Sequence, residues 1–181
     1  MRAFVAIPLP ESLAQQLAAY TVDALTGLDG RAVPTENLHA TVHFLGPVDD
    51  AHAEPLGAAL AVACAAVPPF SIRLAGAALA PPSRPRMIWA RLDAPGELGR
   101  LAQGVAAAAG PFAPAARPPR FGKPHLTLAR LRRRPPRGSE LPPLPAEGAE
   151  IEVGACALVR SQLGRGGARY TTLATLPLGP A

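Results

Sequence analysis

Two short segments of this chain share one pattern, in which a histidine and a threonine stand two residues apart inside an apolar run. The first segment is residues 38–42 (LHATV) and the second is residues 124–128 (PHLTL). Side chains alternate between the two faces of a β-strand, so each histidine is expected to share a face with its threonine. The pattern predicts two strands that each present an imidazole and a hydroxyl from a rigid surface.

Two imidazoles that face each other suit the cleavage of a phosphodiester by in-line displacement. That reaction needs a base on one side of phosphorus and an acid on the other, and histidine, with a pKa of about 6.5, can do both near neutral pH. Threonine hydroxyls on the same faces can donate hydrogen bonds to phosphate oxygens that gain negative charge in the transition state. We therefore expect His39, Thr41, His125 and Thr127 to form one site.

Two further residues are candidates for binding the substrate phosphate. In an unbroken strand, His43 shares the face of His39, and Phe44 points to the core side. Arg130 follows the second motif closely, and a guanidinium binds phosphate well. Strict alternation turns Arg130 away from His125, so this role requires a bulge or a strand end.

Positive charge is concentrated in one part of the chain. Between residues 98 and 139 there are nine cations and no acid, whereas the remainder holds nine cations against thirteen acids. The nine are Arg100, Arg117, Arg120, Lys123, Arg130, Arg132, Arg133, Arg134 and Arg137. Such a cluster favours a polyanionic partner, and the second motif lies within the cluster. The alternative is a solvated basic loop with no partner.

Neither motif contains an acidic residue, and the chain has no His-Glu-x-x-His, so we expect no metal and no other cofactor. Cys64 and Cys156 lie in apolar surroundings without a CxxC, as is typical of buried thiols in a reduced cytoplasmic protein. No segment approaches the ~20 apolar residues that cross a bilayer, and residues 1–8 do not resemble a signal peptide. We expect a cytoplasmic monomer that does not bind membranes.

The spacing of apolar residues predicts three helices among seven strands. The strands are expected over residues 2–8, 38–45, 70–79, 86–92, 123–131, 151–161 and 170–178, and the helices begin near Pro10, Asp49 and Leu98. No long parallel β-α-β series emerges, so the fold class is α+β, with antiparallel or mixed sheets and helices on their outer faces. We expect one domain over residues 1–181, made of two pseudo-twofold lobes that each contribute one motif strand to a central cleft.

The chain resembles the 2H phosphoesterases, and among them the bacterial and archaeal RNA 2′,3′-cyclic phosphodiesterase group, also called the 2′-5′ RNA ligase family. The two HxTx motifs carry most of the resemblance, within residues 36–46 (ENLHATVHFLG) and 124–130 (PHLTLAR). Residues 2–10 (RAFVAIPLP) and 158–163 (LVRSQL), followed by Tyr170 and Pro177-Leu178, are also similar to the family. The similarity covers nearly the whole chain in the family's order.

The resemblance implies a bilobal α+β fold and metal-independent hydrolysis of RNA 2′,3′-cyclic phosphate ends to 2′-phosphomonoesters. It implies that His39 is the proton donor to the leaving 3′ oxygen, that His125 is the proton acceptor for water, and that Thr41 and Thr127 hold the phosphate. The chain departs from the family at Ala40 and His43, where relatives often carry a larger aliphatic residue and a cation. Neither departure removes a catalytic group.

Other functions remain open at this point. The same residues can join RNA ends through a 2′-5′ linkage, or open the ring of another cyclic nucleotide, because acid and base exchange roles in the reverse reaction. A different class of function is a non-catalytic RNA-binding module in which the basic segment dominates. That module would bind RNA in a salt-sensitive way and leave a cyclic phosphate end intact.

Overall fold

The computed structural model describes residues 1–116, 118, 123–164 and 167–180. Its strands are β1 (Arg2–Pro8), β2 (Gly30–Ala32), β3 (His39–Pro47), β4 (Phe70–Ala80), β5 (Met87–Asp93), β6 (His125–Leu131), β7 (Glu150–Val153), β8 (Ala155–Gly164) and β9 (Gly167–Pro177). Its helices are α1 (Glu11–Ala24), α2 (Ala53–Ala65) and α3 (Gly96–Ala109), with short 3-10 turns η1 (Thr35–Asn37) and η2 (Asp50–His52).

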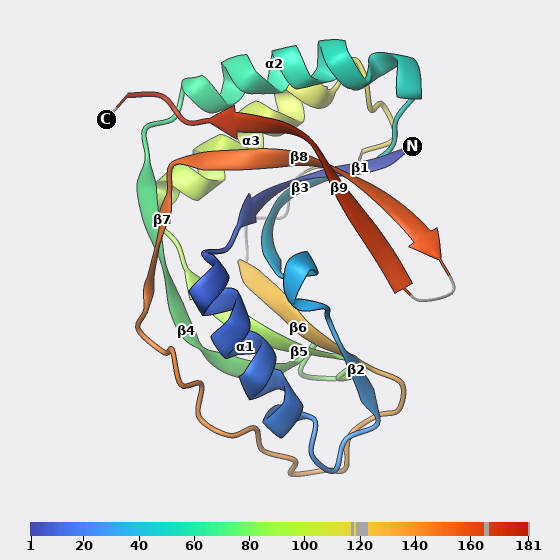
Figure 1. Cartoon of the computed structure of the whole chain (residues 1–181), viewed down its shortest axis with the longest axis vertical. Helices are drawn as coiled ribbons and strands as arrows, with labels where there is room; N and C mark the ends of the chain where they lie inside the picture. Colours follow the sequence, from blue (N-terminus) through green and yellow to red (C-terminus); the bar gives the residue numbers. More distant parts are fainter. Residues whose placement is uncertain (117, 119–122, 165–166, 181) are drawn as a thin grey trace.

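The strands form one curled antiparallel sheet in the order β7-β4-β5-β6-β3-β1-β8-β9, and β2 pairs with β6 beside this path (Figure 1). The predicted α+β class is confirmed. The two motif strands, β3 and β6, are neighbours at the middle of the sheet. They meet through one described residue pair, Ala40 opposite Leu126, so the two halves join as a single sheet.

All three helices pack on one face of the sheet. Helices α2 and α3 lie together over the half that contains β8 and β9, and α1 lies over the half that contains β6 (Figure 1). One apolar core runs between helices and sheet through both halves, with Leu17, Leu60, Leu101 and Leu126 fully buried in it. We call the other side of the sheet, which carries His39, Thr41, His125 and Thr127, the open face.

Two expectations about the strands were wrong. Residues 151–161 form two strands: β7 pairs with β4 at one edge of the sheet, and after Gly154 the chain enters β8, which pairs with β1 in the other half. The apolar alternation continues through both strands, so it gave no sign of the break. The expectation of seven strands also misses β2, whose three residues are too few to show an alternating pattern. In the part of the chain that the structure describes, no helix is long and apolar enough to span a membrane.

Candidate active site

The first motif strand contains a bulge directly after its threonine. Ala6 pairs with Thr41 and Val5 pairs with His43, so Val42 has no partner on β1. A bulged residue reverses the alternation of the residues that follow it. His43 therefore turns to the core side, where it is 5% exposed, and Phe44 turns to the open face, where it is 66% exposed.

The second motif strand contains the same bulge at the equivalent position. Trp89 pairs with Thr127 and Ile88 pairs with Ala129, which leaves Leu128 without a partner on β5. Ala129 is consequently buried, and Arg130 is exposed on the face of His125 and Thr127.

The two bulges overturn the expected positions of His43 and Phe44, and they supply the bulge that the candidate role of Arg130 required. The expectation that His43 shares the face of His39 and can bind substrate phosphate is wrong, because the bulge places His43 on the core side. The expected core position of Phe44 is wrong for the same reason. Arg130 reaches the open face through the bulge that its candidate role required.

The β3–β6 pair brings the two motifs together. Ala40 and Leu126 face the core, so the residues beside them face the open side, with His39 across from Thr127 and Thr41 across from His125. Diagonal neighbours in a regular antiparallel ladder lie about 7–8 Å apart, which leaves room for a phosphate between the two imidazoles. Burial is the largest cause of the lowered pKa of His39, and the guanidinium of Arg130 and the nearby His125 lower it further, as expected for groups gathered in one place.

Both imidazoles are anchored through the same nitrogen. The Nδ1 of His39 donates a hydrogen bond to the carbonyl oxygen of Asn37 (2.7 Å), and the Nδ1 of His125 donates one to the carbonyl oxygen of Lys123 (2.8 Å). Because a carbonyl oxygen only accepts, each Nδ1 carries a proton and each neutral ring keeps its Nε2 lone pair. The Nε2 of His39 lies 3.1 Å from the Thr41 hydroxyl oxygen. Both rings thus hold the tautomer that general acid–base chemistry at Nε2 needs.

Aromatic side chains from neighbouring strands hold the two rings. Phe4 stacks on His39 with ring centroids 4.8 Å apart, and Tyr170 meets His39 edge-on at 5.4 Å. Phe44 lies 6.0 Å from Phe4 and extends this cluster on the open face. On the other side, Trp89 stacks on His125 at 3.7 Å. Sequence reasoning missed Tyr170, because only the register of β9 against β8 places it on this face.

Burial is the main influence on both motif histidines. It lowers the pKa of His39 and of His125 from the usual value of about 6.5, and the hydrogen bonds to the Asn37 and Lys123 carbonyls offset only part of the effect. Burial also lowers the pKa of His43. We therefore expect all three rings to be neutral at pH 7 in the free protein.

This shift predicts a pH-dependent stability. The three histidines bind protons more weakly in the folded chain than in the unfolded chain, so acidification below about pH 6.5 adds protons mainly to the unfolded state. The free energy of unfolding should therefore be constant from pH 8 to 7 and fall from pH 6.5 to 5. Urea denaturation at each pH measures it, and a flat profile from 6.5 to 5 would contradict the lowered pKa values.

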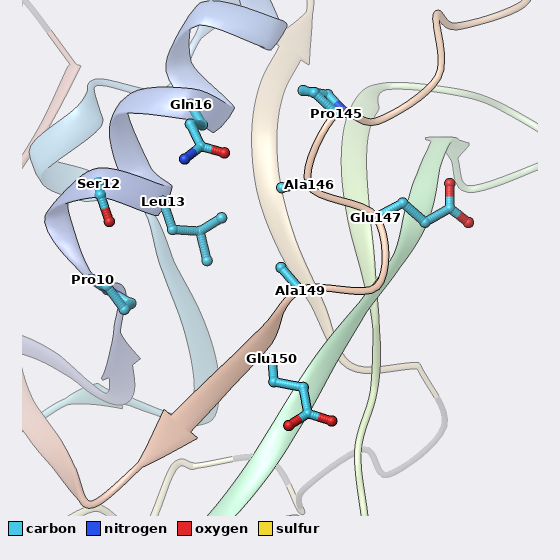
Figure 2. A pocket seen from close by; sticks show the side chains of 9 residues that line it. All are labelled: Pro10, Ser12, Leu13, Gln16, Pro145, Ala146, Glu147, Ala149 and Glu150. Carbon is cyan, nitrogen blue, oxygen red and sulfur yellow. The ribbon is translucent and has the colours of Figure 1, made fainter.

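Two pockets lie away from the motif residues. A pocket of about 450 Å³ lies between the start of α1 and the segment before β7, where Glu147 and Glu150 line it (Figure 2). Another of about 260 Å³ is lined by Ser71 and Asp93 among others. Among the described residues, no group of three or more His, Cys, Asp or Glu side chains could hold a metal ion. Arg117 and Arg120, from the basic segment, lie outside the described residues.

Known proteins are similar to this chain in sequence and in fold. The profile of the family described as "LigT like Phosphoesterase" matches residues 7–89. An RNA 2′,3′-cyclic phosphodiesterase of Thermus thermophilus is 36% identical, over 96% of this chain and 88% of its own. The chain belongs to the LigT-like phosphoesterase family. A relative of the same name from Archaeoglobus fulgidus is 32% identical over 78% of each chain. The chain spans only 56% of a third such LigT-like relative, from Geobacillus stearothermophilus.

Solved structures show the LigT-like fold over the whole chain. A crystal structure of a Thermus thermophilus protein matches with a TM-score of 0.85 at 32% identity, covering 99% of both chains. E. coli LigT complexed with 3′-AMP matches with a TM-score of 0.79 at 28% identity, covering 98% of this chain and 97% of its own. The family expected from the sequence is confirmed.

Proposed function

We propose that this LigT-like phosphoesterase hydrolyses RNA 2′,3′-cyclic phosphate ends to 2′-phosphomonoesters without a metal ion. The observation that carries the proposal is the pair of imidazoles, one from each HxTx strand, anchored at Nδ1 on either side of the Ala40–Leu126 pair. The relatives named RNA 2′,3′-cyclic phosphodiesterase support the substrate class, and E. coli LigT with 3′-AMP supports a nucleotide ligand.

In the proposed reaction His125 is the base and His39 is the acid. Nε2 of His125 takes a proton from water as the water oxygen attacks phosphorus. The bond from phosphorus to the 3′ oxygen breaks, and Nε2 of His39 gives its proton to that oxygen, leaving a 3′ hydroxyl and a 2′-phosphate. Thr41, Thr127 and Arg130 donate hydrogen bonds to the non-bridging oxygens, which carry the developing charge. Proton exchange with water then resets the two rings.

The surroundings of the two rings support this assignment. His39 lies among Phe4, Tyr170 and Phe44, an apolar surface that suits the nucleoside, and the leaving oxygen belongs to that nucleoside. The His125 side chain is less buried than that of His39, so water has better access to it. The negative substrate phosphate raises the pKa of His39 when it binds, against the effects of burial and Arg130, and so favours the protonated acid.

The arrangement of the sheet supports a domain of two pseudosymmetric lobes over residues 1–181. The order β6-β5-β4-β7 on one side corresponds to β3-β1-β8-β9 on the other. Both motif strands also carry their bulge and their histidine anchor at equivalent positions. We further propose a cytoplasmic monomer that acts on RNA ends or cyclic nucleotides; the buried free thiols Cys64 and Cys156 fit a reducing compartment.

The proposed function predicts a single product isomer. Incubation with an oligoribonucleotide that ends in a 2′,3′-cyclic phosphate should give the 2′-phosphate, identified by ³¹P NMR against both authentic isomers, and EDTA should not slow the reaction. A 3′-phosphate product would reverse the assigned bond cleavage. An unchanged cyclic end in a stable complex would instead favour the RNA-binding module. Addition of a 5′-hydroxyl oligonucleotide tests the ligase alternative, which would give a 2′-5′ joined product.

A further inference from the structure

Strand β2 places an arginine directly opposite Arg130. The register is Gly30 to Leu131, Arg31 to Arg130 and Ala32 to Ala129. Directly paired residues share a face of the sheet, and Leu131 and Ala129 are buried on the core side. Arg31 and Arg130 therefore both lie on the open face, and both are exposed.

This pairing is unfavourable in the empty protein, because like charges directly opposite each other in a sheet repel. Among the described residues, no carboxylate lies within ion-pair distance of Arg31 or Arg130. The Arg130 guanidinium is 4.0 Å from the sulfur of Met87. The Arg31 guanidinium lies beside Gly167 at the start of β9, where an added Cβ would be 3.5 Å from its Nη1. A bound anion would relieve the repulsion.

Neighbouring arginines differ from this pair because protein groups hold them. Arg132 and Arg133 form ion pairs with Asp29 at 3.5 and 3.4 Å. Arg134 donates to the carbonyl oxygen of Ser83 at 3.2 Å. These contacts brace the loop after β6, whereas Arg31 and Arg130 point their charges onto the open face.

The arginine pair is close to the proposed reaction centre but displaced from it. Two ladder positions separate Arg130 from Thr127, which is about 7 Å along β6. Arg130 is near enough to contribute to lowering the pKa of His39. Arg31 lies on β2, which pairs with β6 along the same edge as β3. An anion between the two arginines would be a separate group beside the cyclic phosphate. Arg130, whose guanidinium has five N–H donors, can contact both of these phosphates.

We propose that Arg31, together with Arg130, forms a second phosphate subsite that binds the 5′-phosphate of the terminal nucleotide, one nucleotide unit from the cyclic end. This inference rests on the proposed function and adds a preference to it: the enzyme recognises an RNA end by two successive phosphates. Each guanidinium offers a planar fork of donors that matches phosphate oxygens.

Two small substrates test the subsite. They are adenosine 2′,3′-cyclic phosphate and the same nucleotide with a 5′-phosphate. We expect kcat/KM to be about tenfold higher for the 5′-phosphorylated substrate, from one charge-assisted contact. The gain should appear in KM, because the 5′-phosphate takes no part in the reaction and is bound equally in the ground and transition states. Arg31→Gln should bring the ratio of the two kcat/KM values close to one.

Arg100→Gln is the matched control. It removes the same charge from α3, on the helix-covered side, where Arg100 pairs with Glu97, so the tenfold ratio should persist. The ratio does not depend on how much of a variant is folded, since both substrates meet the same enzyme. If Arg31→Gln yields no folded protein, Arg31→Lys, which keeps the charge and loses the fork, should give an intermediate ratio.

The outcomes separate the two proposals. A wild-type ratio near one overturns the subsite, and so does a tenfold ratio that survives in Arg31→Gln or is unchanged in Arg31→Lys. In either case the proposed hydrolysis of the cyclic phosphate is not contradicted. If neither substrate is opened by the wild-type enzyme, and the cyclic-ended oligonucleotide also stays intact, the proposed function fails. If both small substrates stay intact while the oligonucleotide is opened, two cyclic-ended dinucleotides replace them. One has the charged internal phosphodiester in place of the 5′-phosphate and the other has an uncharged linkage there, and the same ratio is expected.

Discussion

Replacement of His125 by asparagine should lower turnover of a cyclic phosphate end by roughly 10²–10⁴-fold. The asparagine amide can still donate to the Lys123 carbonyl that now accepts from Nδ1, so the local backbone keeps its partner. What disappears is Nε2, the atom that takes the proton from water. His39→Asn should have an effect of the same size, because its amide can likewise donate to the Asn37 carbonyl and the variant lacks the proton for the leaving oxygen.

The combination of the two changes gives a sharper test than either alone. Because acid and base act in one step, the double variant should be only slightly slower than each single variant. Initial rates with a cyclic-ended oligonucleotide measure all three variants. His52→Gln is the control, since His52 is an exposed histidine in η2, remote from the open face, and its loss should leave turnover unchanged. Near-native rates in both single variants would refute two-histidine catalysis.

Leu126→Ala should destabilise the protein by about 2–5 kcal/mol, the range for a leucine truncated in a packed core. Leu126 is fully buried and belongs to the residue pair that joins β3 to β6, so the cavity would open between the two halves of the sheet. For a chain of this length the change corresponds to a fall in Tm of about 10 °C. Thermal and urea denaturation measure it.

The exposed counterpart is Leu163→Ala near the end of β8. The Leu163 side chain is 76% exposed, so its truncation should change the free energy of unfolding little. Equal stability of the two variants would mean that the β3–β6 junction is not a packed part of the core. Because Leu126 also sets the separation of the two imidazoles, we expect Leu126→Ala to lower turnover even at temperatures where it stays folded. A folded Leu126→Ala variant with full activity would show that turnover does not depend on the separation of the two imidazoles.

Local patterns were sufficient for most of the elements. The spacing of apolar residues predicted a helix that begins near Pro10, and Leu13, Leu17 and Tyr20, spaced i, i+4 and i+7, are buried in α1. The short apolar run of residues 2–8, which ends at a proline, predicted β1 over the same residues as the structure. The repeated His-x-Thr pattern located both motif strands and the faces of their first three residues. These inferences succeed because helical and strand periods act over a few neighbouring residues and need no knowledge of the partner strand.

Pairing between distant strands decided the rest. The bulges at Val42 and Leu128 exist only relative to β1 and β5. They exchange the faces of His43 and Phe44 and bring Arg130 onto the face of His125. An isolated strand has no register, so its own sequence cannot show where the alternation reverses.

The chain by itself determined which groups are available for chemistry: two imidazoles, two hydroxyls and an excess of arginine near the second motif. Only the tertiary structure decided that Ala40 meets Leu126 and that Arg31 stands opposite Arg130. The physical reason is that residue type and local period are properties of a segment. Proximity and charge repulsion are properties of pairs of segments, and these form only when the sheet assembles.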